Sequence, residues 1–216
     1  MNTSTLLLHA TATTLLITLS ALALGLIGSY LLCLIFNIKH PVTCFLTLSF
    51  IHTIRRTPII LQIFFIYYGL AQIQYIQHTW IWWIIKNPLP TAIVTLGINS
   101  SAYMGYLLIK LIEKTPEAYT QSAKNLGLSP LQVIIHIKLP YAFFQLKPFY
   151  KNEAITLMKA SSLASVIACT ELTSAVNQIA SEDYHMVIWL AVSCVIYWII
   201  GNILSRLAPK ILNLLA

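Results

Sequence analysis

The chain opens with an apolar run over residues 5–36, which ends before the first lysine or arginine, Lys39. About 20 apolar residues are enough for a helix to cross the ~30 Å hydrocarbon core of a bilayer. Charged residues make up 9% of the whole chain, whereas a soluble domain carries about 25%. Lipid offers the backbone no hydrogen bonds, and the apolar runs do not alternate with a period of two, so helices are favoured over a barrel. The sequence therefore predicts an all-α integral membrane protein.

Five apolar segments predict five transmembrane helices in a single domain. They cover residues 5–36, 42–69, 89–112, 152–169 and 184–207. The first segment lacks the basic flank of a secretory signal, so we expect it to be retained, with the N-terminus outside. Alternating from there places most basic residues on the cytoplasmic side, as the positive-inside rule requires. The C-terminus is then cytoplasmic.

Several classes of protein are disfavoured by composition and motifs. The net charge of +7 would suggest nucleic acid in a soluble protein, but here cytoplasmic loops account for it, and we expect no nucleic-acid partner. The four cysteines are scattered singly and the histidines lack ligand spacing, so no metal site is predicted. The patterns H-E-x-x-H and G-x-S-x-G are absent, so we expect no catalytic residues and no enzyme activity.

The stretch over residues 115–140 interrupts the apolar pattern. Gly127 is a typical residue just after a helix end, and Ser129-Pro130 is a typical helix start. We therefore expect two short helices, the second ending at Pro140. Each would have about ten residues and a length of ~15 Å, too short to cross the membrane. The pair would either lie on the membrane surface or dock against a partner protein.

The spacing within this stretch resembles a motif of ABC importer permeases. That motif has Glu-Ala-Ala, a Gly four residues later, and Ile-x-Leu-Pro ten residues beyond the Gly. The matching residues of this chain are Gln121, Ser122, Ala123, Gly127, Ile137, Leu139 and Pro140. Gln121 and Ser122 depart from the pattern, and Gln121 lacks the charge that the family usually offers there.

Other segments resemble the polar amino acid permeases in the same order along the chain. Residues 55–70, RRTPIILQIFFIYYGL, are similar to their Arg-Gly-Thr-Pro segment, with Arg56 in place of the Gly. Residues 99–103 are similar to their third span, and residues 152–166 and 171–173 to their fourth span and its exit. The chain is identified as similar to the membrane-spanning subunit of a polar amino acid ABC importer.

This resemblance implies an assembly in the bacterial cytoplasmic (inner) membrane. Two permease subunits, identical or homologous, would pack together in the lipid, with an ABC ATPase dimer on their cytoplasmic face and an extracytoplasmic amino acid-binding protein outside. The chain has no G-x-x-x-x-G-K-[ST] phosphate loop, so it should carry no cofactor, and the ATPase would bind ATP and Mg. A secondary transporter or channel would need no ATPase, and is the alternative from another class.

Candidate residues of the substrate path come from polar groups within the predicted spans, where ionisable residues are costly and usually face an interior. They are Arg55, Thr57, Asn99, Tyr103, Glu153 and Ser161. Glu153 would hold a cationic group of the substrate or, alternatively, pair with Lys151 or a neighbouring subunit. Arg55 would bind a carboxylate or satisfy carbonyls freed near Pro58. The small polar residues could instead join helices.

The position of Ala160 bears on the substrate. It lies seven residues after Glu153 and so shares its helix face, and the resembling family commonly has Asp there. Glu153 without a second acid favours a basic amino acid such as arginine. Neutral polar and sulfur amino acids are the alternatives.

Overall fold

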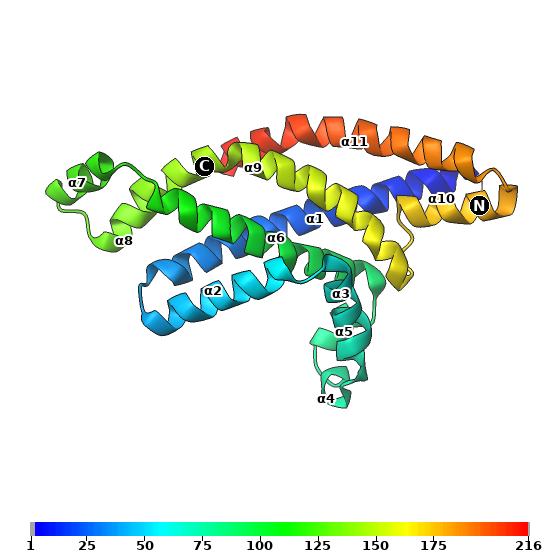
Figure 1. The fold of residues 1–216 in the computed structure, drawn as a ribbon, viewed down its shortest axis with the longest axis horizontal. Helices are drawn as coiled ribbons and strands as arrows, with labels where there is room; N and C mark the ends of the chain where they lie inside the picture. The colour runs from blue at the N-terminus through cyan, green and yellow to red at the C-terminus, as the bar shows by residue number, and fades with distance from the viewer. Residues whose placement is uncertain (1–2, 216) are drawn as a thin grey trace.

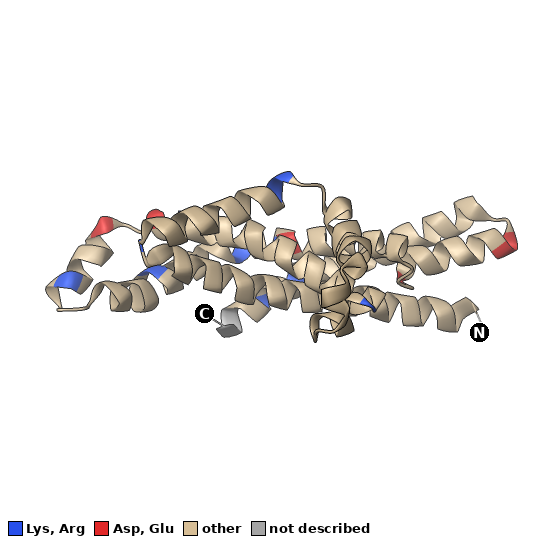
Figure 2. Cartoon of the chain, turned by 90° about the horizontal axis from the view of Figure 1, so that it is seen from below, with Lys and Arg blue, Asp and Glu red and all other residues tan. Residues whose placement is uncertain are grey.

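The computed structural model describes residues 3–215, and within that range all of the regular structure is helical. Three helices are each long and apolar enough to cross a membrane: α1 (Thr3–Asn37), α6 (Pro88–Glu113) and the Met186–Leu212 part of α11 (Met186–Leu215). A fourth candidate span is a pair bent by 55°, Pro130–Ile167 followed by Leu172–Asp183. The chain is therefore an all-α membrane protein with three to four candidate spans. Charged residues are sparse along these long helices (Figure 2).

The helices α1 and α6 form the centre of the bundle, with the long helix α9 (Leu139–Ala160) packed on both (Figure 1). The α1–α6 contact is close because small residues face each other. A Cβ atom added at Gly28 would lie 2.6 Å from the Cβ of Ser101, and one added at Gly25 would overlap the side chain of Ser100. Small residues allow close approach of membrane helices in this way.

The outer helices pack against this centre. The helix α11 runs along α9, and α10 (Leu172–Asp183) turns back along α1 and α11. The short helices α4 (Gln74–Gln77) and α5 (Ile81–Ile85) project with α3 (Ile59–Phe64) away from the bundle (Figure 1). At the far end of the molecule lie α7 (Glu117–Asn125) and α8 (Pro130–Val133).

The segment predicted as one span over residues 42–69 is broken in its middle. The helix α2 (Pro41–Arg56) ends at Thr57, which has an extended backbone, and α3 (Ile59–Phe64) starts after Pro58. The residue before a proline is pushed out of the helical region, which explains the break. The chain then continues through a π-helical turn, η1 (Phe65–Gly69), and a 3₁₀ turn, η2 (Leu70–Gln72).

The predicted turn between the two short helices is confirmed at its centre. Gly127 has a φ of +81°, the left-handed conformation that glycine adopts at no steric cost. The N–H of Gly127 donates to Lys124 O, and that of Leu128 donates to Ala123 O, which is the Schellman pattern of a helix end. Ser129 then caps α8, and its side chain and that of Gln132 form a reciprocal capping box.

The prediction that the second short helix ends at Pro140 is wrong. The helix continues from α8 through a π-helical turn, η3 (Ile134–Lys138), into α9 and a 3₁₀ segment, η4 (Ser161–Ile167). Pro140 cannot donate a backbone hydrogen bond and normally breaks a helix. Here it lies at the start of α9, immediately after the wider π turn, in which the N–H of Leu139 donates to Ile134 O. The predicted fourth span, residues 152–169, is thus only the distal part of a helix that starts in the 115–140 stretch.

Candidate functional site

A cavity of about 480 Å³ lies where the broken end of α2 meets α6 and α9. Its walls contain five of the six residues predicted for the substrate path: Arg55, Thr57, Asn99, Tyr103 and Glu153. The remaining lining residues are Arg56, Pro58, Ile59, Thr156, Leu157 and Ala160. Three segments that are distant in sequence therefore converge on one polar hollow near the middle of α6.

The break before Pro58 is held open by Gln62. Its Nε2 donates to Ile54 O at 2.8 Å, to Thr57 O at 3.1 Å and to Thr57 Oγ1 at 2.8 Å. Its Oε1 accepts from Asn99 Nδ2 at 3.1 Å. Gln62 therefore satisfies carbonyls that the helix break leaves without a partner and ties them to α6. Arg55 was considered for this role from the sequence, and the structure gives it to Gln62.

Arg55 is held by aromatic rings. Its guanidinium carbon lies 4.1 Å from the ring centroid of Tyr106 and 5.2 Å from that of Tyr103, which is within the range of cation–π attraction. The hydroxyl of Tyr103 donates to Arg55 O at 3.2 Å. Within the described residues, Arg55 Nε is buried and has no hydrogen-bond partner. The guanidinium is thus held in place by two aromatic rings beside the cavity that Arg55 lines.

Glu153 is the acidic residue of the cavity. It is buried on the inner face of α9, and the half-buried Ala160 lines the same cavity, as the seven-residue spacing predicts. Among residues 3–215, the single ion pair is Lys110 with Glu113, so neither Lys151 nor an arginine of the cavity pairs with Glu153. The cavity therefore presents cationic and anionic groups that are not neutralised by each other.

Ser161 lies apart from this cavity. Its side chain is fully buried, and its hydroxyl donates to Met158 O at 2.7 Å. Ser100 contacts Gly25 of α1 and is not among the residues that line the cavity. These small polar residues occupy helix contacts, whereas Asn99 and Tyr103 reach the cavity.

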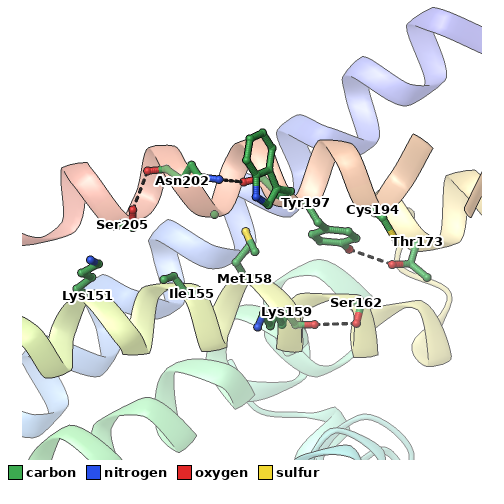
Figure 3. Close-up of a pocket in the computed structure, with 12 residues that line it drawn as sticks. Lys151, Ile155, Met158, Lys159, Ser162, Thr173, Cys194, Tyr197, Asn202 and Ser205 are labelled. Carbon is green, nitrogen blue, oxygen red and sulfur yellow. Dashed lines mark hydrogen bonds between the residues drawn. The ribbon is translucent and has the colours of Figure 1, made fainter. Parts of the chain in front are cut away.

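A larger hollow of about 730 Å³ lies between α9 and α11 (Figure 3). It contains Lys151 and Lys159 but none of the predicted path residues. In Figure 3 the Tyr197 ring points to Thr173, and the two hydroxyls are 2.9 Å apart. The hydroxyls of Ser162 and Ser205 donate to backbone carbonyls of their own helices. This hollow offers cations without an acid, so the cavity at Glu153 fits a zwitterion better.

The residues of the predicted coupling motif gather around α7 and α8. Ala123 and Leu139 are buried, while Gln121, Ser122, Gly127 and Pro140 are exposed and Ile137 is half-buried. Gln121 Nε2 lies 3.4 Å from Asn125 Oδ1 of the same helix. Beside Gly127, the side chains of Leu126 and Leu131 are 80% and 61% exposed. A turn with protruding apolar side chains is a suitable surface for docking into a partner's groove.

Sequence reasoning missed two residues of the candidate site. Tyr106 was not singled out, although it lies seven residues after Asn99 and therefore near the same face of α6. Gln62 was quoted within a motif but given no role. A glutamine in an apolar segment shortly after a proline was the available signal, because a polar side chain in lipid needs a partner.

Comparison with known proteins places the chain among transport proteins. Residues 27–214 match the family described as "Binding-protein-dependent transport system inner membrane component". The nopaline transport system permease protein NocM of Agrobacterium fabrum is 32% identical over 93% of this chain and 84% of the relative. The arginine ABC transporter permease protein ArtM of Escherichia coli is 31% identical over 78% of this chain and 76% of the relative.

Two further similarities bear on length and fold. The octopine transport system permease protein OccM of Rhizobium radiobacter is 32% identical over 73% of this chain, which spans 64% of that relative's length. A solved structure of an amino acid ABC transporter with histidines superposes with a TM-score of 0.83, covering 97% of this chain and 94% of that chain at 24% identity. The helices described above therefore form the fold of such a permease.

Proposed function

The chain belongs to the family of binding-protein-dependent transport system inner membrane components, and from this premise we propose that it is the permease subunit of an ATP-driven importer of basic amino acids. Its work is transport rather than catalysis, with ATP and Mg bound by a separate ATPase. Relatives named for arginine, octopine and nopaline transport support a basic substrate.

The observation that carries the proposal is the charge pattern of the 480 Å³ cavity. An α-amino acid has a carboxylate and an ammonium group, and a basic one has a second cation. The guanidinium of Arg55, which lines the cavity, suits the carboxylate, and the buried Glu153 suits a cation. Charged groups at membrane depth are costly unless they pair, which a bound substrate would allow.

The proposed topology has five spans with the N-terminus outside and the C-terminus in the cytoplasm. The broken segment α2–α3 with its η turns would be the second span, and α9 with η4 the fourth. The end of the molecule that carries α7 and α8 would then be cytoplasmic, in accord with the lysines near it. This orientation places the docking turn at Gly127 where an ATPase could reach it.

The proposed assembly follows from this orientation. An ABC ATPase dimer would contact α7 and α8, a second permease would complete the membrane part, and a binding protein would deliver substrate from outside. The binding protein is in accord with the description of the family, whose members are inner membrane components of binding-protein-dependent transport systems. The location would be the bacterial inner membrane.

The continuity of the helix suggests how ATPase movement would reach the substrate. From Pro130 to Glu153 the chain is helical without a break. At 1.5 Å per residue this distance is ~35 Å. A displacement of α8 by the ATPase would therefore move Glu153 relative to Arg55, because these two residues lie on different elements of the cavity wall.

The test is uptake by the complete transporter in proteoliposomes that carry the binding protein. We expect ATP-dependent uptake of arginine that Glu153→Gln reduces at least tenfold, about 1.4 kcal/mol, while basal ATP hydrolysis is unchanged. The control Lys151→Gln should retain uptake, since Lys151 lies outside the cavity. Normal arginine uptake in Glu153→Gln would refute the proposed role of the carboxylate. Uptake that does not require ATP would favour the secondary-transporter alternative.

A further inference from the structure

The helix α2 carries a polar face that the bundle does not cover. Six residues line a hollow of about 410 Å³ on this face: Phe45, Leu48, Ser49, His52, Thr53 and Arg56. Ser49, His52 and Arg56 are spaced by three and four residues, so they lie on one side of the helix. On the opposite side, Thr47 and Ile51 are buried against the bundle.

This face is unsuitable for lipid. An arginine, a histidine and two hydroxyl residues would have to enter the hydrocarbon, where such groups are costly and normally line an interior or a water-filled cavity. Within the described part of the chain, no carboxylate forms an ion pair with Arg56. The ring of His52 lies 6.2 Å from that of Tyr106, the same tyrosine that stacks under Arg55.

The polar face is continuous with the cavity of the candidate site. Arg56 lines both hollows, at the point where α2 ends. From Arg56 the polar side chains extend back along α2 to Ser49, about 10 Å at 1.5 Å per residue, and Phe45 continues the wall toward Pro41. Pro41 follows Lys39 and His40, which the proposed topology places in the cytoplasm.

We propose that this face of α2 is the wall of a water-filled release route, along which the amino acid leaves the cavity for the cytoplasm. The direction of release rests on the proposed function and its orientation. Arg56 is the junction, since its guanidinium can meet the carboxylate of the solute in either hollow. His52, Thr53 and Ser49 offer further hydrogen-bonding groups along the way.

A dry contact with a second copy of this chain fits this face less well. The chain has six acidic residues, Glu113, Glu117, Glu153, Glu171, Glu182 and Asp183. Glu153 and Glu171 are buried within the bundle, and the other four lie at or near helix ends. A second copy would therefore bring no exposed acid to the depth of Arg56, whereas water would solvate it.

Cysteine labelling tests the proposal in the complete transporter. Cys33, Cys44, Cys169 and Cys194 are first replaced, and single cysteines are then introduced as Ser49→Cys, His52→Cys or Phe50→Cys. Phe50 is the matched control because it is exposed but lies about 100° around the helix from Ser49 and about 160° from His52. The reagent is a charged, membrane-impermeant thiosulfonate applied from the ATPase side.

We expect Ser49→Cys and His52→Cys to react at least about tenfold faster than Phe50→Cys, because the reagent needs water. Equally slow labelling of all three, in transporter that assembles and hydrolyses ATP, would overturn the proposal. The proposal would also be overturned if Ser49→Cys were not labelled but formed an oxidative cross-link between two permease subunits. That result would identify a dry interface. If one cysteine variant fails to assemble, the other serves with the same control.

Arginine uptake by the cysteine-free parent separates this inference from the proposed function. Fast labelling without arginine uptake would leave the water-filled face in place and refute the basic substrate. Normal arginine uptake with slow labelling would refute the release route alone.

Discussion

At the scale of single residues, the candidate site depends on a division of labour between Gln62 and Arg55. A helix break at membrane depth leaves carbonyls that must find donors, since lipid supplies none. Gln62 provides those donors by three hydrogen bonds to Ile54 and Thr57. Arg55 is thereby free to rest on Tyr106 at the wall of the cavity.

Replacement of Gln62 should therefore destabilise the permease. We expect Gln62→Leu to lower stability by about 1–3 kcal/mol, because the carbonyls of Ile54 and Thr57 lose a donor. The measurement is thermal unfolding of the purified protein in detergent. Gln74→Leu is the control, since Gln74 is exposed in the projecting segment, and it should change the melting temperature little. Equal melting temperatures for both variants would contradict the structural role of Gln62.

Five of the six residues predicted for the path line the cavity, and the sequence could bring them together because their signals are local. Glu153 and Arg55 are charges within apolar segments, and the face shared by Glu153 and Ala160 follows from helix periodicity. Gln62 was harder to assign because its partner Asn99 lies 37 residues away. The placement of Ser161 was left open for a similar reason, since hydroxyls that return to their own helix and hydroxyls that face a cavity look the same in sequence.

At the scale of elements, the capping rules succeeded, whereas the rule that proline ends a helix failed in α9, which contains Pro140 and Pro148. The turn at Gly127 and the cap at Ser129 depend on residues within one turn of each other, so the sequence predicted both. The passage of the helix through Pro140 depends on the π turn Ile134–Lys138, which changes the hydrogen-bond register. No residue type marks such a turn, so the continuous helix could not be predicted.

The left-handed conformation of Gly127 gives a prediction for the docking turn. A Cβ added there would meet no atom within 4 Å, so the cost of Gly127→Ala is conformational, about 1–2 kcal/mol. Gly127→Asn should cost less, because asparagine tolerates this conformation. We expect ATPase binding, measured by co-purification, to follow the order Gly, Asn, Ala, while membrane insertion is unchanged.

We expect Gly127→Asp to reduce ATPase binding more than Gly127→Ala or Gly127→Asn does, because it also places a negative charge in the turn. If Gly127→Asp assembled with the ATPase and transported at the normal rate, the turn would not be the docking element.

The contact between α1 and α6 gives a second prediction at this scale. Gly25→Ala should destabilise the bundle by about 1–3 kcal/mol, because its Cβ would overlap Ser100 in a tightly packed contact. Gly201→Ala is the matched control, since its nearest neighbour is the flexible end of Met158 at 3.4 Å. Thermal unfolding in detergent measures both. If Gly25→Ala were as stable as Gly201→Ala, α1 and α6 could move apart without a loss of stability, and the close contact would not be needed.

At the scale of the whole molecule, the docking end and the cavity are joined by one helix rather than by two. The sequence suggested a pair of short helices that is separate from the following span. A loop would then have to transmit movement from the ATPase contact to Glu153. The structure replaces that loop by the continuous path from α8 to α9. Helices are stiff along their axis, so ATPase movement would reach Glu153 with little loss.

Softening α9 between the docking turn and Glu153 should therefore uncouple transport from ATP hydrolysis. Gln145 and Asn152 are both exposed on α9, and glycine within a helix costs about 1 kcal/mol per position relative to alanine. We expect the double variant Gln145→Gly, Asn152→Gly to import less arginine per ATP hydrolysed, because the flexible helix absorbs part of the movement. The control is Gln145→Ala, Asn152→Ala, which removes the same side chains and keeps the helix stiff. The ratio of uptake to hydrolysis in proteoliposomes measures the effect, and the same ratio in both double variants would show that α9 does not carry the movement.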